Sequence, residues 1–150
     1  ATMILKWQSE NTAPLLRLWL ESTTEAHPFI DASYWQANEA VVRDDYLPAA
    51  ETWVWEENGT LCGFISVMQF QFVGALFVAP AFIGKGIGRA LPKHVQQHYP
   101  YLTLEVYQKN VRAVNFYHAQ GFRIEDSAWQ DDTQHPTWIM SWQADQTPLR

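Results

Sequence analysis

Cysteine is almost absent from this sequence, since Cys62 is the only one in 150 residues. A single cysteine excludes an internal disulfide and a cysteine-based zinc cluster within one chain, and we expect it to be a small core residue. Long apolar runs are missing too, because no stretch approaches the roughly 20 residues that a membrane-spanning helix needs. The first residues do not show the charged start and apolar middle of a secretion signal. We therefore expect a cytoplasmic protein without a membrane partner.

Basic residues are also scarce, with 10 Lys and Arg against 16 Asp and Glu and a net charge of −6. This acidic balance argues against nucleic acid as a partner. The bases are unevenly distributed along the chain. Residues 83–123 contain six basic residues and one acidic residue, whereas the remainder contains four basic and fifteen acidic residues. The basic segment predicts an anionic ligand at this place, and the alternative is a set of scattered, solvated charges.

Apolar residues, in contrast, are plentiful. Hydrophobic residues make up 47% of the chain and aromatic residues 15%. This share is large enough for a core and excludes a disordered chain. The length suits one domain, and neither a repeat nor a linker-like stretch interrupts the sequence. We expect residues 1–150 to form a single domain.

The spacing of apolar residues predicts the order β-α-α-β-β-β-α-β-α-β-β, which belongs to the α/β (α+β) class. Asn58-Gly59 predicts a hairpin turn, and Pro48 and Gly121 predict the ends of two helices. The strands at 70–78 and 101–106 are so apolar that we expect both to be buried, the first on both faces. The predicted ranges are a strand at 3–8, a helix capped by Asn11 or Thr12 that fades near Thr24, a helix at 32–46, strands at 52–56, 61–68 and 70–78, a helix at 86–98, a strand at 101–106, a helix at 110–120, and strands at 122–129 and 137–142.

A glycine-rich turn directly follows the strand at 70–78 and opens the next helix. It reads Gly84-Lys85-Gly86-Ile87-Gly88-Arg89. Glycines let the backbone approach a ligand closely, and the N–H groups at the start of a helix attract anions. Lys85 and Arg89 add positive charge, so the turn predicts a pyrophosphate site, although a glycine-rich turn can also be only a turn. Its spacing fits neither a Walker loop nor a Rossmann fingerprint.

A second segment begins with the strand around Glu105 and continues into the helix at 110–120. Asn110, Ala113 and Tyr117 are spaced at i, i+3 and i+7, which places them on one side of this helix. By itself this pattern is also compatible with ordinary helix packing. Together, and in this order, the glycine turn and the helix point to one ligand site.

These two motifs resemble those of the GNAT superfamily of N-acetyltransferases. The glycine turn and the preceding Leu76-Phe77-Val78-Ala79-Pro80 are similar to its acetyl-CoA-binding motif, and residues 110–122 resemble its second core motif. The likeness covers essentially the whole chain and is greatest to small bacterial members. It implies the GNAT fold, in which a central mixed, twisted sheet of about seven strands has helices on both faces.

The resemblance implies an enzyme that moves an acetyl group from acetyl-CoA to a primary amine. Its small bacterial members favour a protein lysine as acceptor, while a likeness to enzymes that acetylate ribosomal-protein N-termini allows an α-amine. The acidic residues outside the basic segment suit a cationic acceptor. A non-catalytic CoA-binding or interaction module on the same fold is the alternative. We expect no metal site.

The resemblance also implies roles for single residues at the donor. Backbone groups of Leu76, Phe77 and Val78 would pair with the pantetheine arm, and one N–H of this strand would polarise the thioester carbonyl. Asn110 would contact the cofactor. Tyr117 occupies the helix position that faces the thioester sulfur and matches the usual general acid of the family.

Glu105 matches the glutamate that some members use as the general base. Strand alternation turns it away from the side of Leu104 and Val106, so that its carboxylate can reach the cleft. The alternatives are a solvated strand residue or a salt bridge to Arg112 or Lys109.

His27 is a second candidate base, because it lies in the loop between two helices that form the acceptor wall in the family, and water is a third. With Phe29 it is a candidate for contact with the substrate, although a loop histidine can equally be structural. Two residues depart from the family pattern. Ile83 stands where an Arg or Gln is usual, and Pro92 should kink the helix after the glycine turn.

Overall fold

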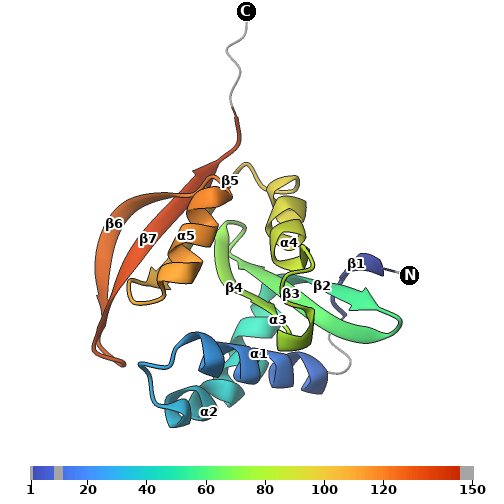
Figure 1. Ribbon diagram of the computed structural model, residues 1–150, viewed down its shortest axis with the longest axis horizontal. Helices are drawn as coiled ribbons and strands as arrows, with labels where there is room; N and C mark the ends of the chain where they lie inside the picture. Colours follow the sequence, from blue (N-terminus) through green and yellow to red (C-terminus); the bar gives the residue numbers. More distant parts are fainter. Residues whose placement is uncertain (1, 9–11, 146–150) are drawn as a thin grey trace, which may run out of the picture.

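A seven-stranded mixed sheet crosses the protein in the computed structural model, which describes residues 2–8 and 12–145 (Figure 1). The order of its strands is β1-β2-β3-β4-β5-β7-β6, and all neighbours are antiparallel except β4 and β5. The strands are β1 (Thr2–Lys6), β2 (Ala50–Glu57), β3 (Thr60–Met68), β4 (Phe72–Val78), β5 (Tyr101–Tyr107), β6 (Arg123–Gln130) and β7 (His135–Gln143).

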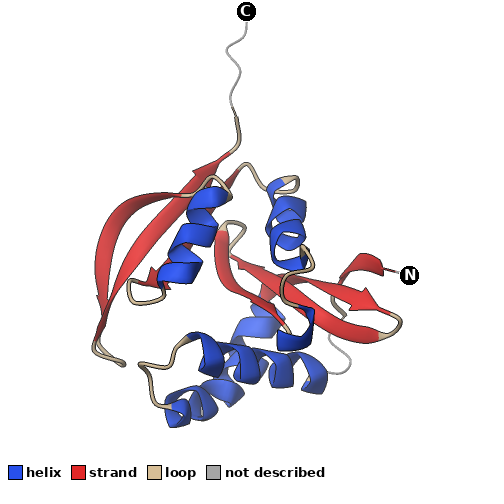
Figure 2. Cartoon of the chain, in the orientation of Figure 1, coloured by secondary structure: helices blue, strands red, loops and turns tan. Residues whose placement is uncertain are grey.

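Helices cover both faces of this sheet, as Figure 2 shows. On one face, α4 and α5 pack on a core that includes Leu91, Leu104 and Phe122. On the other face, α1 packs on a smaller core with Leu15 and Phe64. The predicted class, strand number and two-sided cover are therefore confirmed. The helical segments are α1 (Ala13–Ala26), α2 (Ala32–Val41), a π-helical turn η1 (Val42–Tyr46), α3 (Leu47–Ala49), a 3₁₀ turn η2 (Pro80–Phe82), α4 (Ile87–Gln96) and α5 (Val111–Ala119).

The two parallel strands β4 and β5 separate soon after they meet. Within the described residues they pair at one position, where Phe72 lies opposite Thr103. A β-bulge in the pairing of β4 with β3 leaves Gly74 as the extra residue of β4. Because a bulge bends its strand, β4 turns away from β5 after this point. The splay opens the middle of the sheet.

This splay explains why the prediction for the strand at 70–78 was wrong. We expected burial on both faces, but Val73 is the buried residue of β4 and Gly74 is exposed, while the other residues of β4 are half-buried. On the edge away from β3, β4 borders an opening instead of a paired strand along most of its length. In β5 only the alternate residues Leu102, Leu104 and Val106 are buried, and the residues between them, among them Glu105 and Tyr107, line the cleft side or are more exposed.

The second predicted helix also differs from expectation. It was expected to end at Tyr46, before Pro48, but α2, η1 and α3 continue through Pro48 to Ala49. In η1 the N–H of Leu47 donates to the carbonyl of Val42, five residues earlier. The wider turn accommodates Pro48, which stands in the first turn of α3, where its missing N–H is not needed.

Other helix ends fall within a few residues of the prediction. The proposed cap Asn11 lies outside the described residues, and Thr12 precedes α1 without a side-chain capping bond. Helix α4 continues through Pro92, whose ring is buried, to Gln96. At α5, Asn110 is the N-terminal cap and accepts a hydrogen bond from the N–H of Ala113.

Candidate functional site

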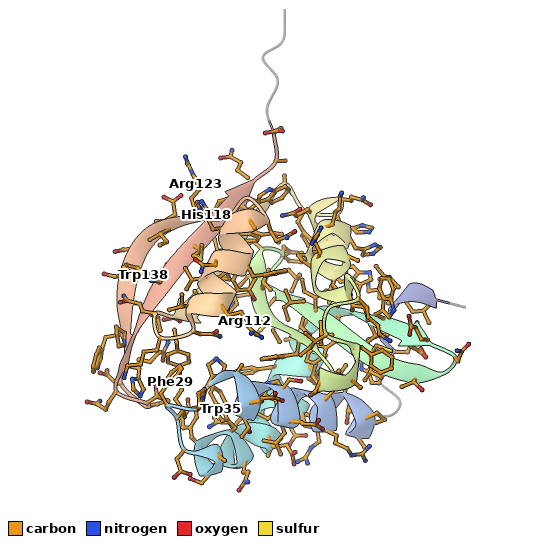
Figure 3. The ribbon with its side chains drawn as sticks, in the orientation of Figure 1. Phe29, Trp35, Arg112, His118, Arg123 and Trp138 are labelled. Atoms are coloured by element: carbon orange, nitrogen blue, oxygen red, sulfur yellow. The ribbon has the colours of Figure 1, made fainter. Side chains whose placement is uncertain are left out.

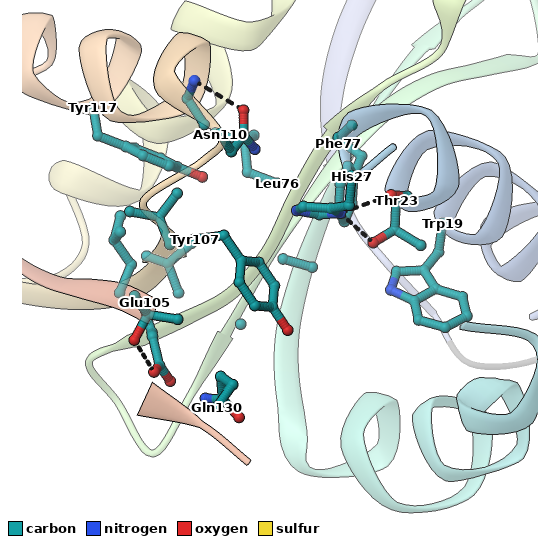
Figure 4. A pocket seen from close by; sticks show the side chains of 18 of the residues that line it. Trp19, Thr23, His27, Leu76, Phe77, Glu105, Tyr107, Asn110, Tyr117 and Gln130 are labelled. Carbon is teal, nitrogen blue, oxygen red and sulfur yellow. Dashed lines mark hydrogen bonds between the residues drawn. The ribbon is translucent and has the colours of Figure 1, made fainter. Parts of the chain in front are cut away.

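The splay between β4 and β5 is the floor of a cleft with a volume of about 430 Å³. Its walls come from α1 and α2 on one side and from α5 on the other (Figure 4). The cleft brings together these predicted site residues: His27, Leu76, Phe77, Glu105, Asn110 and Tyr117. The predicted residues that do not line it are Phe29, Val78 and the glycine turn from Gly84 to Arg89.

The glycine turn lies just outside the cleft, where β4 leads into α4. Gly84 and Gly86 have positive φ angles of 88° and 85°, a region that favours glycine over other residues. Gly86 is the N-terminal cap of α4, and among the described residues this helix start has no side-chain capping bond. A Cβ atom added at either glycine would meet nothing within 4 Å, so the space in front of the turn is open. This arrangement fits a pyrophosphate.

Positive charge surrounds the same turn. Lys85 and Arg89 are exposed, and the ammonium of Lys85 lies 5.3 Å from the centre of the Phe82 ring. Gly88 faces the end of β4, because a Cβ atom there would lie 3.6 Å from a methyl group of Val78. The turn and the cleft are therefore adjacent, as a ligand with a pyrophosphate and a long arm requires.

Tyr117 reaches the cleft from α5, on the face of the sheet that holds the larger core. Its ring packs edge-on against Phe116 and Phe122, with centroids 5.4 and 5.7 Å away. Burial raises the pKa of Tyr117 to about 12, because the phenolate would be poorly solvated there. The phenol therefore stays protonated throughout the physiological pH range.

Glu105 lies on the opposite face of the sheet, as the alternation of β5 predicts. Its Oε2 atom accepts a hydrogen bond of 2.6 Å from the hydroxyl of Thr137, which is 1% exposed and lies on β7. The predicted alternative of a salt bridge to Arg112 or Lys109 is not found in the described part of the chain. The carboxylate of Glu105 is thus held by Thr137 where it lines the cleft.

His27 follows the last residue of α1 and is 9% exposed. Its Nδ1 atom lies 2.7 Å from the carbonyl oxygen of Thr23 and 3.3 Å from the hydroxyl of the same residue. Its ring contacts those of Trp35 and Tyr107, with centroids 5.1 and 5.3 Å apart. Burial lowers the pKa of His27 below its usual value, which favours the neutral ring.

Phe29 does not line the cleft itself but packs against His27. Its ring lies 5.8 Å from that of His27 and 5.0 Å from that of His135, and its carbonyl lies 3.2 Å from His135 Nε2. The loop between α1 and α2 therefore meets the tip of the β6–β7 hairpin, and Figure 3 shows Phe29 between that tip and Trp35.

Several residues that line the cleft beside His27 and Glu105 were not predicted from the sequence. Tyr107 could have been found, because it follows Glu105 by two residues and so shares its face of β5. The hydroxyl of Tyr107 is 3.1 Å from that of Thr133. Tyr34, Trp35 and Thr137 could not be placed without the packing of α2 and the register of β7, and no local pattern marks them.

Comparison with known proteins places these observations in a family. The sequence model of the acetyltransferase (GNAT) family matches residues 12–122. The chain belongs to this family. The predicted fold family and the predicted class of enzyme, an acetyltransferase, are thereby confirmed.

Two related proteins of this family come from Escherichia coli K12. Peptidyl-lysine N-acetyltransferase YiaC is 57% identical over 145 residues, which cover 97% of this chain and 99% of YiaC. Peptidyl-lysine N-acetyltransferase YjaB is 34% identical over 134 residues, 89% of this chain and 90% of YjaB. The solution structure of apo-form YjaB has a TM-score of 0.80 at 30% identity and covers 95% of this chain and 97% of its own. The predicted likeness to the small bacterial members is confirmed.

Within residues 2–8 and 12–145, no helix is long and apolar enough to cross a membrane. The same residues contain no group of three or more His, Cys, Asp or Glu side chains that could hold a metal ion.

Proposed function

We propose that this acetyltransferase acetylates lysine side chains of peptides or proteins. The donor is acetyl-CoA, which a GNAT family acetyltransferase from Elizabethkingia anophelis holds in its crystal structure. The observation that carries the proposal is that one cleft receives Tyr117 from one face of the sheet and Glu105 from the other. The name of YiaC, a peptidyl-lysine N-acetyltransferase at 57% identity, supports lysine as the acceptor.

The donor would be held chiefly by main-chain groups. The first N–H groups of α4, after Gly86, would bind the pyrophosphate, and Lys85 and Arg89 would add charge. Beyond Phe72, β4 does not pair with β5. The backbone groups on this edge of β4, near Leu76 and Phe77, therefore have no partner on β5. These groups are available to the pantetheine arm. Bound in this way, acetyl-CoA supplies a thioester carbonyl that an amine can attack.

Tyr117 is proposed as the general acid. A phenol that remains protonated at physiological pH can donate to the departing sulfur at any working pH. Tyr117 lines the cleft near Asn110 and Leu76 (Figure 4), which supports a position of its hydroxyl beside the thioester. Asn110 itself is engaged as the cap of α5, so its role would be to fix the start of this helix.

Glu105 is proposed as the base that prepares the acceptor. A lysine side chain with a pKa near 10.4 enters the cleft as an ammonium ion and must lose a proton before it can attack. Thr137 holds Oε2 of Glu105, and Oε1 would take the proton. The aromatic side chains of Tyr34, Trp35 and Tyr107 form a wall on this side that suits the apolar stem of lysine.

A thiol-release assay with acetyl-CoA tests the proposal. Lysine peptides with a blocked N-terminus should be acetylated, and lysine-free peptides with a free α-amine should be poorer acceptors. Acetyl-CoA, but not ATP or NAD, should raise the thermal midpoint, since a ligand that binds only the folded state stabilises it. Absence of release with every amine would reject the proposal. The single domain and the cytoplasmic location expected from the sequence are part of this proposal, and cell fractionation would test the latter.

A further inference from the structure

Acetylation of a lysine requires more proton acceptors than Glu105 alone provides. The lysine ammonium has three protons on nitrogen, and the amide product has one. Two protons therefore leave the nitrogen, one before it attacks the carbonyl carbon and one after the N–C bond has formed. A single carboxylate holds one proton at a time. If the first proton remains on Glu105 during the reaction, the second needs another acceptor in the same cleft.

His27 has the geometry of such an acceptor. A carbonyl oxygen can only accept a hydrogen bond, so the contact of 2.7 Å with the Thr23 carbonyl requires the proton on Nδ1. In the neutral ring, Nε2 then carries a free lone pair. Figure 4 shows the ring held at Thr23 by one end, while its other end extends into the cleft. The tautomer and the direction of the lone pair are thus both determined by α1.

The surroundings of His27 hold this arrangement. The ring lies among those of Phe29, Trp35 and Tyr107, which come from the loop after α1, from α2 and from β5. The lowered pKa of the buried ring keeps it neutral near pH 7 and so able to receive a proton. On β4 no titratable side chain faces it. The titratable and charged side chains that line the cleft with His27 are Tyr34 on α2, Glu105 and Tyr107 on β5, and Arg112 and Tyr117 on α5.

We propose that Nε2 of His27 is the second proton acceptor of the reaction. Glu105 takes the first proton from the ammonium, and the neutral amine forms the N–C bond. His27 then takes the second proton from this nitrogen as the C–S bond breaks, and Tyr117 gives its proton to sulfur. Afterwards one of the two collected protons returns to Tyr117 and the other goes to solvent. This inference rests on the proposed function, because it assigns a residue to that same reaction.

The first test is the variant His27→Asn. The amide nitrogen of asparagine can take the place of Nδ1 and donate to the Thr23 carbonyl, but no basic atom remains at the position of Nε2. We expect kcat to fall on the order of 10²-fold, the usual lower range for a lost acid or base, with little change in KM or CoA affinity. The fall should be equal for lysine and α-amine acceptors, since both nitrogens lose this second proton. The exposed His118, substituted in the same way, serves as the control.

A second test distinguishes proton transfer from packing. In His27→Ala, added imidazoles should restore turnover, and the restored rate should rise with the pKa of the imidazole. A filler of the cavity would restore turnover according to size alone, and that result would overturn the proposal. Nitrogen NMR of the wild-type protein at pH 7 gives a readout that needs no variant. It should show the proton of His27 on Nδ1, and a proton on Nε2 would overturn the proposal even if the alanine variant does not fold.

The two levels of inference fail in different ways. An active wild-type enzyme with an equally active His27→Asn variant would remove His27 from the reaction and leave the proposed function intact. A wild-type protein that acetylates no amine would remove both.

Discussion

The two ends of the cleft are built on different principles. At the donor end, six consecutive residues from Gly84 to Arg89 present main-chain N–H groups and exposed charge to an open space. At the acceptor end, buried side chains from α1, α2, β5 and β7 contact one another, as the pairs His27–Trp35 and Glu105–Thr137 illustrate. Under the proposed function, the difference teaches that the donor would be recognised mainly through the backbone, whereas the acceptor would be recognised and deprotonated by packed side chains. Substitutions should therefore act differently at the two ends.

The largest effect is expected at the donor end, from Gly86→Asp. A carboxylate about 4 Å from a phosphate costs about 4 kcal/mol at an effective dielectric constant of 20, or roughly 10³-fold in Kd. Calorimetric titration with CoA would measure it. The substitution also strains the backbone, because φ of Gly86 is 85°. Gly59→Asp is the matched control, since Gly59 has a φ of 79° and equally open surroundings in the β2–β3 hairpin. Equal CoA affinity of the two variants would place the pyrophosphate elsewhere.

Tyr117→Phe tests the residue that stands between the two ends. Turnover should fall on the order of 10²-fold, whereas CoA affinity and the thermal midpoint should stay close to wild type because the ring still packs. Steady-state kinetics and a melting curve measure both quantities. Tyr101→Phe, at a tyrosine that is 40% exposed, is the control. Wild-type turnover in Tyr117→Phe would leave the tyrosine with a packing role only.

At the acceptor end, Glu105→Gln should change the preference between acceptors. A lysine is almost wholly protonated at pH 7, whereas an α-amine with a pKa near 8 is partly neutral. We expect kcat/KM to fall on the order of 10²-fold for a lysine peptide, and to fall only about 10-fold for an α-amine. Donor affinity, measured by titration with CoA, should not change.

Thr137 offers a matched pair of variants for the same comparison. Thr137→Ser keeps the hydroxyl that donates to Glu105, and Thr137→Val removes it at nearly the same volume. The valine variant should resemble a weaker Glu105→Gln, while the serine variant should resemble wild type. An impaired serine variant beside a fully active valine variant would mean that the methyl group, and not the hydrogen bond, matters.

The smallest effect concerns stability and pH. Burial lowers the pKa of His27 in the folded state, so the unfolded chain binds more protons as the pH falls below about 6.5. The free energy of unfolding should therefore decrease on acidification, and His27→Asn should weaken this decrease. Urea unfolding at pH 7.5 and pH 5.5 measures the difference. The pKa of His94 is also lowered by burial, so His94→Asn should remove a separate part of the same dependence. An unchanged pH dependence in both variants would contradict this origin.

Features of the fold and of the candidate site that depend on a few consecutive residues could be predicted from the sequence. The glycine turn and the alternation that turns Glu105 outward are local patterns, and each was found where it was predicted. The order of helices and strands along the chain follows from the same kind of signal. Apolar content, however, could not tell that β4 borders a cleft, because the bulge at Gly74 has no marker besides a glycine.

The contacts around Glu105 and the packing of α2 at the cleft could not be predicted from the sequence. The contact between Thr137 and Glu105 joins residues 32 positions apart and depends on the register of β5 against β7. The wall of Tyr34, Trp35 and Tyr107 depends on how α2 packs. A sequence pattern describes neighbours along the chain, whereas the residues from α2, β5 and β7 come together only in space.

The burial of Cys62 has a practical consequence for measurements on this enzyme. Its thiol is fully buried and donates to the carbonyl of Thr60 at 3.3 Å, and burial raises its pKa, so that little reactive thiolate forms. A chromogenic thiol reagent should then leave the folded protein uncoloured and report only the CoA that each turnover liberates. On heating, the same reagent should begin to label the chain itself at the temperature where the core opens. One dye in one cuvette could thus record catalysis and unfolding in succession.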